Sequence, residues 1–173
     1  MTQLDPKALA RINVDDIYPP LMALAVRLLE NCEAQGARYY VVSGLRTHAE
    51  QEALYAQGRT APGAVVTRAR GGESLHNHGL ALDFCRDSNM TRAGLQPDWS
   101  KRAYEALAHE AAKLGLEPGL YWKFTDAPHV QLKISVHGLD VRKLQAQYAT
   151  GGLAGVWRHL DGFTWPQVPQ SST

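Results

Sequence analysis

The chain has 173 residues, of which 45% are hydrophobic and 20% are charged. These values are ordinary for a globular protein, and the length suits one domain with a single core. The formal net charge is +1, and no basic stripe is visible, which argues against a nucleic-acid-binding protein. We expect a single domain over residues 1–165 and a flexible C-terminal tail over residues 166–173.

The sequence gives no sign of membrane attachment. It contains no run of 18 apolar residues, so no membrane-spanning segment is expected. The first seven residues lack the charged-then-apolar layout of a signal peptide. We therefore expect a chain without stable membrane association, kept in a cytoplasm unless another protein releases it.

The first part of the chain predicts a helix, a strand and a second helix. Apolar residues recur at three- and four-residue spacing over 19–35, which indicates a helix with one apolar face. A run of β-formers over 38–43 predicts a strand. Thr47 and Glu50 form a capping-box pattern that opens a short helix ending at Gly58. The two cysteines, Cys32 and Cys85, are not in a CxxC motif, and we expect buried free thiols.

The middle of the chain alternates between loops and regular elements. Residues 59–73 are rich in Gly, Arg and Thr and predict a surface loop near a site. Alternating apolar residues over 79–85 predict a strand. A polar loop over 86–98 and a helix from residue 99 or 100 to Lys113 are expected to follow.

The last elements complete an α+β pattern. Two strands are predicted over 121–125 and 129–136, and short helices over 140–148 and 153–160. Helices that flank a small central antiparallel sheet are the expected architecture. Three aromatic residues are expected to lie in the core rather than to bind substrate: Tyr121, Trp122 and Trp157.

The segment from Ser74 to Asp83 carries two imidazoles and a carboxylate. Asp83 lies in the middle of an apolar strand, on the face opposite its Leu and Phe side chains. Such a carboxylate is unfavourable unless it is paired or bound to a metal. Two interpretations stay open for Asp83, namely a metal ligand or a salt bridge to Arg46 or another cation. The spacing alone does not decide between His76 and His78 as a ligand.

A second segment, Asp126 to His129, supplies one more imidazole and one more carboxylate. His129 begins a predicted strand on the face opposite its apolar residues, and the Ala127-Pro128 pair can bend the chain toward Asp126. A strand histidine and a turn-capping aspartate are the alternatives. Together the two segments predict three ligands and an open position, as in a catalytic zinc site. The same ligands also suit iron.

These motifs resemble a known family. Ser74-x-His76-x-x-Gly79-x-Ala81-x-Asp83 looks like the signature of the zinc D-Ala-D-Ala carboxypeptidases and L-alanyl-D-glutamate endopeptidases. Asp126-x-Pro128-His129 resembles the second motif of their phage endolysin branch. The resemblance extends over roughly residues 21–160 and also includes these segments: Ser43–Thr47, Glu50–Gln51, Leu54–Arg59, Gly151–Leu153 and Val156–Trp157. It implies the zinc DD-peptidase (hedgehog-like) fold.

The resemblance also implies a role for each site residue. It implies Zn²⁺ as the cofactor and three ligands: His76, Asp83 and His129. It implies Asp126 as general base, because a carboxylate can accept and return a proton during peptide hydrolysis. Arg46 would bind a substrate carboxylate or steady the oxyanion, and pairing with Asp83 or Glu50 is the alternative.

Three further residues are expected beside the ligands. We expect His78 to line the cleft or support a ligand, and Ser74 to hydrogen-bond near the site or simply to cap a loop turn. Carboxypeptidase-type relatives carry a histidine where this chain has Gln131, and Glu where it has Asp126. Both differences favour the endopeptidase branch.

The expected function is therefore a zinc-dependent peptidoglycan peptidase of phage-lysin type that cuts the stem peptide between L-Ala and D-Glu. It would act as a monomer, waiting in the host bacterial cytoplasm until it is released to the cell wall. Three alternatives stay open: a D-Ala-D-Ala carboxypeptidase, a non-catalytic zinc module that binds peptide or a protein partner, and a metal-free domain with buried His and Asp.

Overall fold

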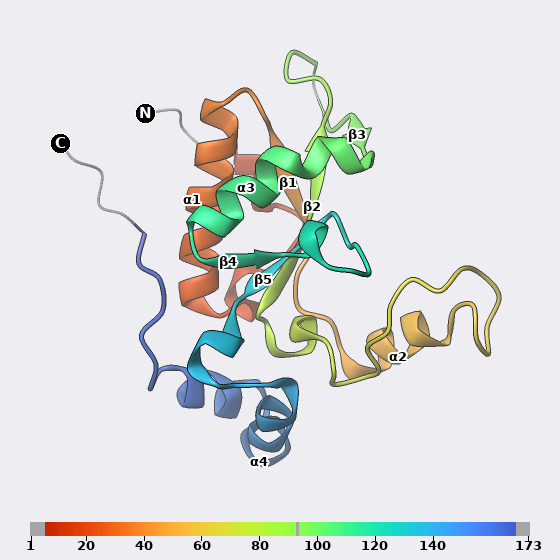
Figure 1. Cartoon of the computed structure of the whole chain (residues 1–173), viewed down its shortest axis with the longest axis vertical. Coiled ribbons are helices and arrows are strands. Elements are labelled where there is room, and N and C mark those ends of the chain that lie inside the picture. Colours follow the sequence, from red (N-terminus) through yellow and green to blue (C-terminus); the bar gives the residue numbers. More distant parts are fainter. Residues whose placement is uncertain (1–5, 93, 169–173) are drawn as a thin grey trace. The chain divides into compact units, whose positions relative to one another are not determined.

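The computed structural model describes residues 6–92 and 94–168, which divide into two compact units. Unit 1 comprises the described residues of 1–44, 81–133 and 165–173, and unit 2 comprises 45–80 and 134–164. Figure 1 shows the ribbon coloured along the sequence, from red at the N-terminus to blue at the C-terminus, so the segments of each unit can be located by residue number. A single domain over residues 1–165 stays a prediction. Two predictions fall partly outside the described residues. The predicted tail loses residues 169–173, and the N-terminal segment without a signal-peptide pattern loses residues 1–5.

Unit 1 is built on a five-stranded antiparallel sheet. Its strands are β1 (Tyr39–Ser43), β2 (Ala81–Asp87), β3 (Pro97–Asp98), β4 (Leu116–Pro118) and β5 (His129–Leu132). The order is β1-β2-β5-β4, with β3 paired to β2. Every pairing is antiparallel, which confirms the predicted small antiparallel sheet. Figure 1 shows β2 between β1 and β5, so β2 supplies the middle of the sheet.

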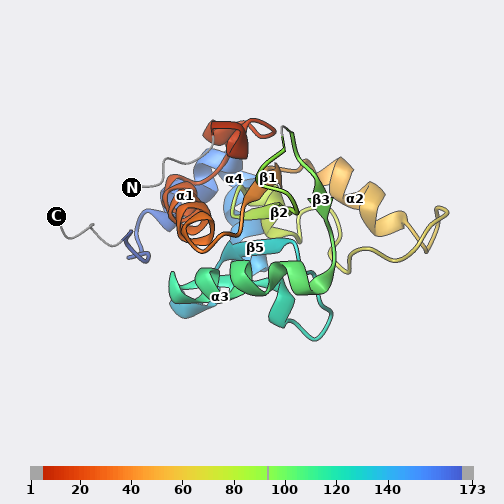
Figure 2. The ribbon, with the colours of Figure 1, turned by 90° about the horizontal axis from the view of Figure 1, so that it is seen from above.

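Two helices pack on this sheet. Helix α1 (Pro19–Ala34) contacts β1 and α3 (Glu105–Lys113), and α3 contacts β4. Figure 2 shows α1 and α3 beside each other next to the strands. The predicted apolar face of α1 is buried, including Cys32, and Cys85 is also a buried free thiol, as expected. Four 3-10 helices complete the described part of unit 1: η1 (Pro6–Leu9), η2 (Val14–Asp16), η4 (Lys101–Tyr104) and η5 (Gly119–Tyr121).

Unit 2 contains the elements α2 (His48–Ala56), η3 (Leu75–His78), η6 (Ile134–His137) and α4 (Val141–Leu160). The predicted capping box opens α2: the Thr47 side chain accepts from the Glu50 amide, and the Glu50 carboxylate accepts from the Thr47 amide. The two short helices predicted at the end of the chain form one run that is interrupted at Gly152, where φ is 59° and ψ is −154°.

Two predicted strands differ from the structure. Residues 121–125 form no strand, because the chain leaves α3 at Gly115, forms β4 at once and then turns through η5. Tyr121 is 61% exposed, so its assignment to the core was wrong. The predicted strand over 129–136 ends at Leu132 and continues as η6, and Val136 is 61% exposed despite its place in the alternation.

Smaller differences concern the segment between β2 and α3. The predicted polar loop begins two residues late, because β2 extends to Asp87, and it ends in β3. The helix predicted from residue 99 or 100 starts as the 3-10 turn η4. No helix within residues 6–92 and 94–168 has the length and apolar character that crossing a membrane requires.

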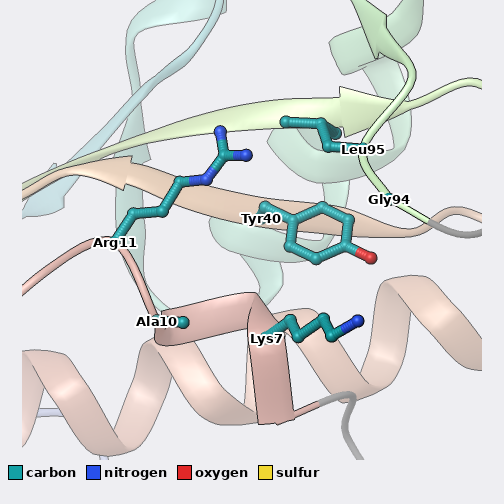
Figure 3. Close-up of a pocket in the computed structure, with 6 residues that line it drawn as sticks. All are labelled: Lys7, Ala10, Arg11, Tyr40, Gly94 and Leu95. Carbon is teal, nitrogen blue, oxygen red and sulfur yellow. The ribbon is translucent and has the colours of Figure 1, made fainter.

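A small pocket of about 210 Å³ opens on unit 1 between η1 and β1 (Figure 3). Lys7, Arg11 and Tyr40 line it together with small and apolar residues. None of the predicted site residues lines this pocket, so the candidate site has to be built from other parts of the fold.

Candidate active site

Asp83 and His129 are paired across adjacent strands of unit 1. The register of β2 and β5 places the two residues directly opposite each other. The Nδ1 atom of His129 lies 3.2 Å from the Oδ1 atom of Asp83. Their side chains are 6% and 20% exposed, so the pair is largely shielded from solvent. Strand register thus brings together two of the predicted ligands, which are 46 residues apart in the sequence.

The other nitrogen of His129 is held by Gln131. The Nε2 atom lies 3.0 Å from the Oε1 atom of Gln131, two residues further along β5. An amide oxygen only accepts hydrogen bonds, so Nε2 carries the proton in this contact. A neutral His129 would then present the lone pair of Nδ1 toward Asp83. Gln131 therefore determines which nitrogen of His129 faces the carboxylate.

An aromatic ring fixes the plane of the same imidazole. The Trp122 ring lies 5.0 Å from the His129 ring, centre to centre. Its Nε1 atom donates to Oε1 of Glu117 at 2.9 Å, and Glu117 lies opposite Gln131 in the pairing of β4 with β5. The imidazole is thus constrained at both nitrogens and on one side of the ring. Trp122 is only partly buried, and its clearest contact is with a site residue.

Burial and charge act on His129 in opposite directions. Burial lowers the pKa of His129, but the hydrogen bond and the negative charge of Asp83 outweigh it, and Gln131 and Asp126 add to the increase. The net pKa is raised. The site therefore favours a positive charge between Asp83 and His129, whether a proton or a metal cation supplies it.

Asp126 lies at the end of a tightly closed loop. Its amide donates to the Gly119 carbonyl at 3.0 Å, and its own carbonyl accepts from the His129 amide at 3.2 Å. The second bond closes the bend that Ala127-Pro128 was expected to provide. The Asp126 carboxylate is close enough to raise the pKa of His129 by its charge.

His76 lies on η3 in unit 2. Ser74 caps this turn: its Oγ accepts from the His76 amide at 3.3 Å. Gly79 ends the turn with φ at 69°, a left-handed conformation that glycine adopts without strain. His76 is only 2% exposed. The capping role gives Ser74 a definite contact with the backbone of a predicted ligand.

His78 occupies a different environment from His76. Its Nε2 atom lies 3.1 Å from the Gly72 carbonyl, and the Tyr148 ring packs edge-on against it. Burial lowers the pKa of His78 to about 4, so the ring is neutral at neutral pH. The Trp157 indole donates to the His78 carbonyl at 2.9 Å, which attaches α4 to η3. These contacts describe a packed supporting residue.

Arg46 precedes α2 and is held at both ends. Its amide donates to the His76 carbonyl at 3.1 Å, and its Nη1 atom donates to Oε1 of Gln51 at 2.8 Å. The Glu50 carboxylate, one of the alternative partners of Arg46, is used by the Thr47 amide and hydroxyl. Arg46 and the His76 turn are therefore joined through the backbone within unit 2.

Sequence reasoning missed several residues that shape the site. Asn77 and Gln51 are 1% exposed and hydrogen-bond around Arg46, and Gly119 lies against Asp126. Two signals were available in the sequence: Asn77 stands between the two histidines of the first motif, and Gln51 lies in the Glu50–Gln51 segment of the family resemblance. The contacts that these residues and Gly119 make depend on pairings that no local pattern encodes.

Comparisons with known proteins identify the family. The sequence profile of VanY, described as D-alanyl-D-alanine carboxypeptidase, matches residues 17–135. The peptidoglycan L-alanyl-D-glutamate endopeptidase CwlK of Bacillus subtilis (strain 168) is 37% identical over 128 residues, which cover 68% of this chain and 74% of CwlK. Both matches are long enough to show kinship over most of the chain.

Solved structures show the same fold. The L-Ala D-Glu endopeptidase ChiX of Serratia marcescens matches with a TM-score of 0.52 and 24% identity, over 78% of this chain and 96% of ChiX. The LD-carboxypeptidase LdcB matches with a TM-score of 0.50 and 22% identity, over 75% of each chain. The expected antiparallel sheet with flanking helices is confirmed, and the chain belongs to the VanY family of peptidoglycan peptidases.

Proposed function

We propose that the chain is a zinc-dependent peptidoglycan peptidase that hydrolyses the L-Ala–D-Glu bond of the stem peptide. His76, Asp83 and His129 each offer one ligand atom for the metal. The ligand set, two imidazoles and one carboxylate, leaves a position open for water, as catalytic zinc sites do. The bond assignment is supported by CwlK, a relative that is named for this cleavage.

The observation that carries the proposal is the arrangement of His129 between Asp83 and Gln131. With the Nε2 proton directed to Gln131, the lone pair of Nδ1 and the Asp83 carboxylate oxygen face each other at 3.2 Å. Two acceptors at that distance repel unless a positive charge lies between them. A divalent cation satisfies both atoms, and the hydrogen bond to Gln131 then orients the ligand from behind. The residues therefore fit the metal.

When bound, zinc supplies an acidified water and polarises the scissile carbonyl. The rest of the chemistry belongs to the chain. The Asp126 carboxylate accepts a proton from the attacking water and returns it to the leaving amine. The Arg46 guanidinium binds a carboxylate of the stem peptide. Ser74 and Gln131 hold the His76 backbone and the His129 ring in the required orientation.

A second candidate is D-Ala-D-Ala carboxypeptidase action, which is favoured by the description of the matching family profile. The two activities release different products from one substrate. We therefore propose digestion of defined pentapeptide muropeptides with the zinc-loaded protein, followed by mass spectrometry. Cleavage after L-Ala is expected. Free D-Ala as the sole product would transfer the assignment to the carboxypeptidase, and no cleavage would favour a non-catalytic zinc module.

The biological setting that we propose is host lysis by a phage endolysin. This proposal is supported by the motif Asp126-x-Pro128-His129, which resembles the second motif of the phage endolysin branch. Such a protein would act as a monomer on the stem peptide, accumulating in the bacterial cytoplasm before release to the cell wall. Lysis of outer-membrane-permeabilised cells by the purified protein is the direct test, and intact cells after treatment with active enzyme would count against it.

A further inference from the structure

Two buried side-chain amides, Asn77 and Gln51, surround Arg46 in unit 2. Each is only 1% exposed. A buried amide is unfavourable unless its polar atoms are hydrogen-bonded, so its partners show what the residue is there to hold. Both residues belong to unit 2, as do these hydrogen-bond partners: Arg46, Thr47, Thr67, Ala69, Gly72 and Ser74.

Asn77 uses its full hydrogen-bonding capacity. Its Oδ1 atom accepts from the amides of Gly72 at 2.9 Å and Ser74 at 3.3 Å. Its Nδ2 atom donates to the carbonyls of Arg46 at 2.8 Å and Thr47 at 3.2 Å. An Asn side chain has two donors and room for two acceptor contacts, and all four are occupied. Asn77 thus connects the segment before η3 to the backbone of Arg46.

The same connection includes His76. The His76 amide donates to Ser74, whose own amide donates to Asn77. The His76 carbonyl accepts from the Arg46 amide at 3.1 Å. The backbones of a proposed zinc ligand and of a proposed substrate-binding residue are therefore held in one hydrogen-bonded frame.

Gln51 fixes the other end of Arg46. Its Oε1 atom accepts from Nη1 of Arg46 at 2.8 Å. Its Nε2 atom donates to the Ala69 carbonyl at 2.9 Å and to Oγ of Thr67 at 3.3 Å. The guanidinium is thus held by a neutral acceptor that is itself anchored to Thr67 and Ala69, in the segment that links α2 to η3.

We propose that Asn77 and Gln51 are positioning residues that preorganise Arg46 to bind a free carboxylate beside the scissile bond of the stem peptide. This inference rests on the proposed function. A side chain already held in its binding geometry loses less conformational freedom when the ligand arrives. Substrate affinity is therefore the quantity that these two amides raise, and amidation of the substrate carboxylate should remove their effect.

The test is a double-mutant cycle between Asn77→Asp and Arg46→Ala. Asn77→Asp keeps the shape and both acceptor contacts but removes the two donors to the Arg46 and Thr47 carbonyls. Misplacement of Arg46 is expected to raise the KM of the zinc-loaded enzyme for the free-carboxylate muropeptide about tenfold. Both kcat and the zinc dissociation constant should stay within about twofold of the wild-type values. In the Arg46→Ala background the same substitution should leave KM unchanged.

Gln51→Met is a second test variant that stays informative if Asn77→Asp fails to fold. It should also raise KM in the presence of Arg46 and leave KM unchanged in the Arg46→Ala background. Asn89→Asp is the matched control, because Asn89 belongs to a turn of unit 1 and accepts from Thr91 through its oxygen. Its KM should equal that of the wild type. On the amidated muropeptide, wild type and both variants should have equal KM.

Each other outcome has a definite meaning. An unchanged KM in the variants, or an equal rise in KM with and without Arg46, overturns the positioning role while leaving the proposed peptidase intact. A wild-type protein that binds no zinc and cleaves no muropeptide overturns the proposed function and this inference together. The zinc titration and the wild-type digest therefore separate the two failures.

Discussion

Gly119 and Asp126 lie in direct contact in the loop before β5. The Gly119 carbonyl accepts from the Asp126 amide at 3.0 Å, and the place that a Gly119 β-carbon would need is taken by the Asp126 carbonyl oxygen. The same β-carbon would lie 3.1 Å from Cβ of His129. Any side chain at this position must therefore displace the proposed base, the proposed ligand, or both.

Gly119→Ala is expected to reduce kcat/KM by about 100-fold, because a displacement near 1 Å is enough to misalign a catalytic group. Zinc affinity should fall as well, since His129 moves with the loop. Steady-state digestion of muropeptides and a chelator competition measure both effects. Gly151→Ala is the control, because only the end of the Arg158 side chain lies near its β-carbon. An unaltered Gly119→Ala enzyme would show that the loop adapts.

The two histidines of the first motif should behave differently when they are replaced. His76→Ala is expected to abolish zinc binding at stoichiometric concentration, because a catalytic site that loses one of three protein ligands loses most of its affinity. His78→Gln should keep zinc bound, since the Nε2 atom of His78 is used by the Gly72 carbonyl. Metal analysis after gel filtration gives the ratio. Loss of zinc in His78→Gln alone would mean that the ligand register is wrong.

Gln131→Leu should weaken zinc binding without removing a ligand. The substitution deletes the acceptor that holds the Nε2 proton of His129, and loss of such outer contacts typically lowers metal affinity 10- to 100-fold. Gln131→Glu keeps an acceptor at the same place and should retain affinity within about tenfold. Chelator competition provides the constants. Equal affinities for Gln131→Leu and wild type would remove Gln131 from the proposed site.

The pairing of Asp83 with His129 shows which part of the site a sequence can predict. Alternation put Asp83 on the face opposite the Leu and Phe side chains of its strand and His129 on the face opposite the apolar residues of its own, and both assignments needed only local patterns. Their opposition across β2 and β5 required the sheet register. The strand expected at 121–125 failed for a related reason: β-forming aromatic residues there lie on an exposed loop, and the close approach of Gly119 to Asp126 sets its course.

The contacts around Arg46 illustrate the remaining limit. The partners that the sequence suggested for Arg46 were the carboxylates of Asp83 and Glu50, because opposite charges are expected to pair. Within unit 2 the structure adds two neutral partners, the side-chain amide of Gln51, five residues on, and the side-chain amide of Asn77, 31 residues on, which donates to the Arg46 carbonyl. Neutral amides carry no charge pattern that a sequence reading can follow, and their partners are mostly backbone groups. Positioning residues of this kind are visible only after folding.

Asp126→Asn should separate catalysis from metal binding. The amide cannot accept the proton of the attacking water, so kcat is expected to fall by about 10²- to 10⁴-fold. Zinc affinity should stay near that of the wild type, because Asp126 is not among the proposed ligands. Asp15→Asn, on a surface turn of unit 1, is the control. Undiminished cleavage by Asp126→Asn would refute the base assignment.

The low pKa of His78 predicts acid sensitivity of the fold. Burial lowers this pKa from 6.5 to about 4, so the unfolded chain binds a proton between these values while the folded chain does not. The contribution of neutral His78 to the free energy of unfolding is fully present above pH 6.5. It decreases as the pH falls toward 4, by about 3 kcal/mol. Denaturant unfolding at pH 7 and pH 4, with metal chelated, measures the loss.

His78→Gln keeps a donor for the Gly72 carbonyl but cannot titrate, so it should lose about 3 kcal/mol less than wild type. Parallel losses in wild type and His78→Gln would show that His78 does not carry the acid sensitivity.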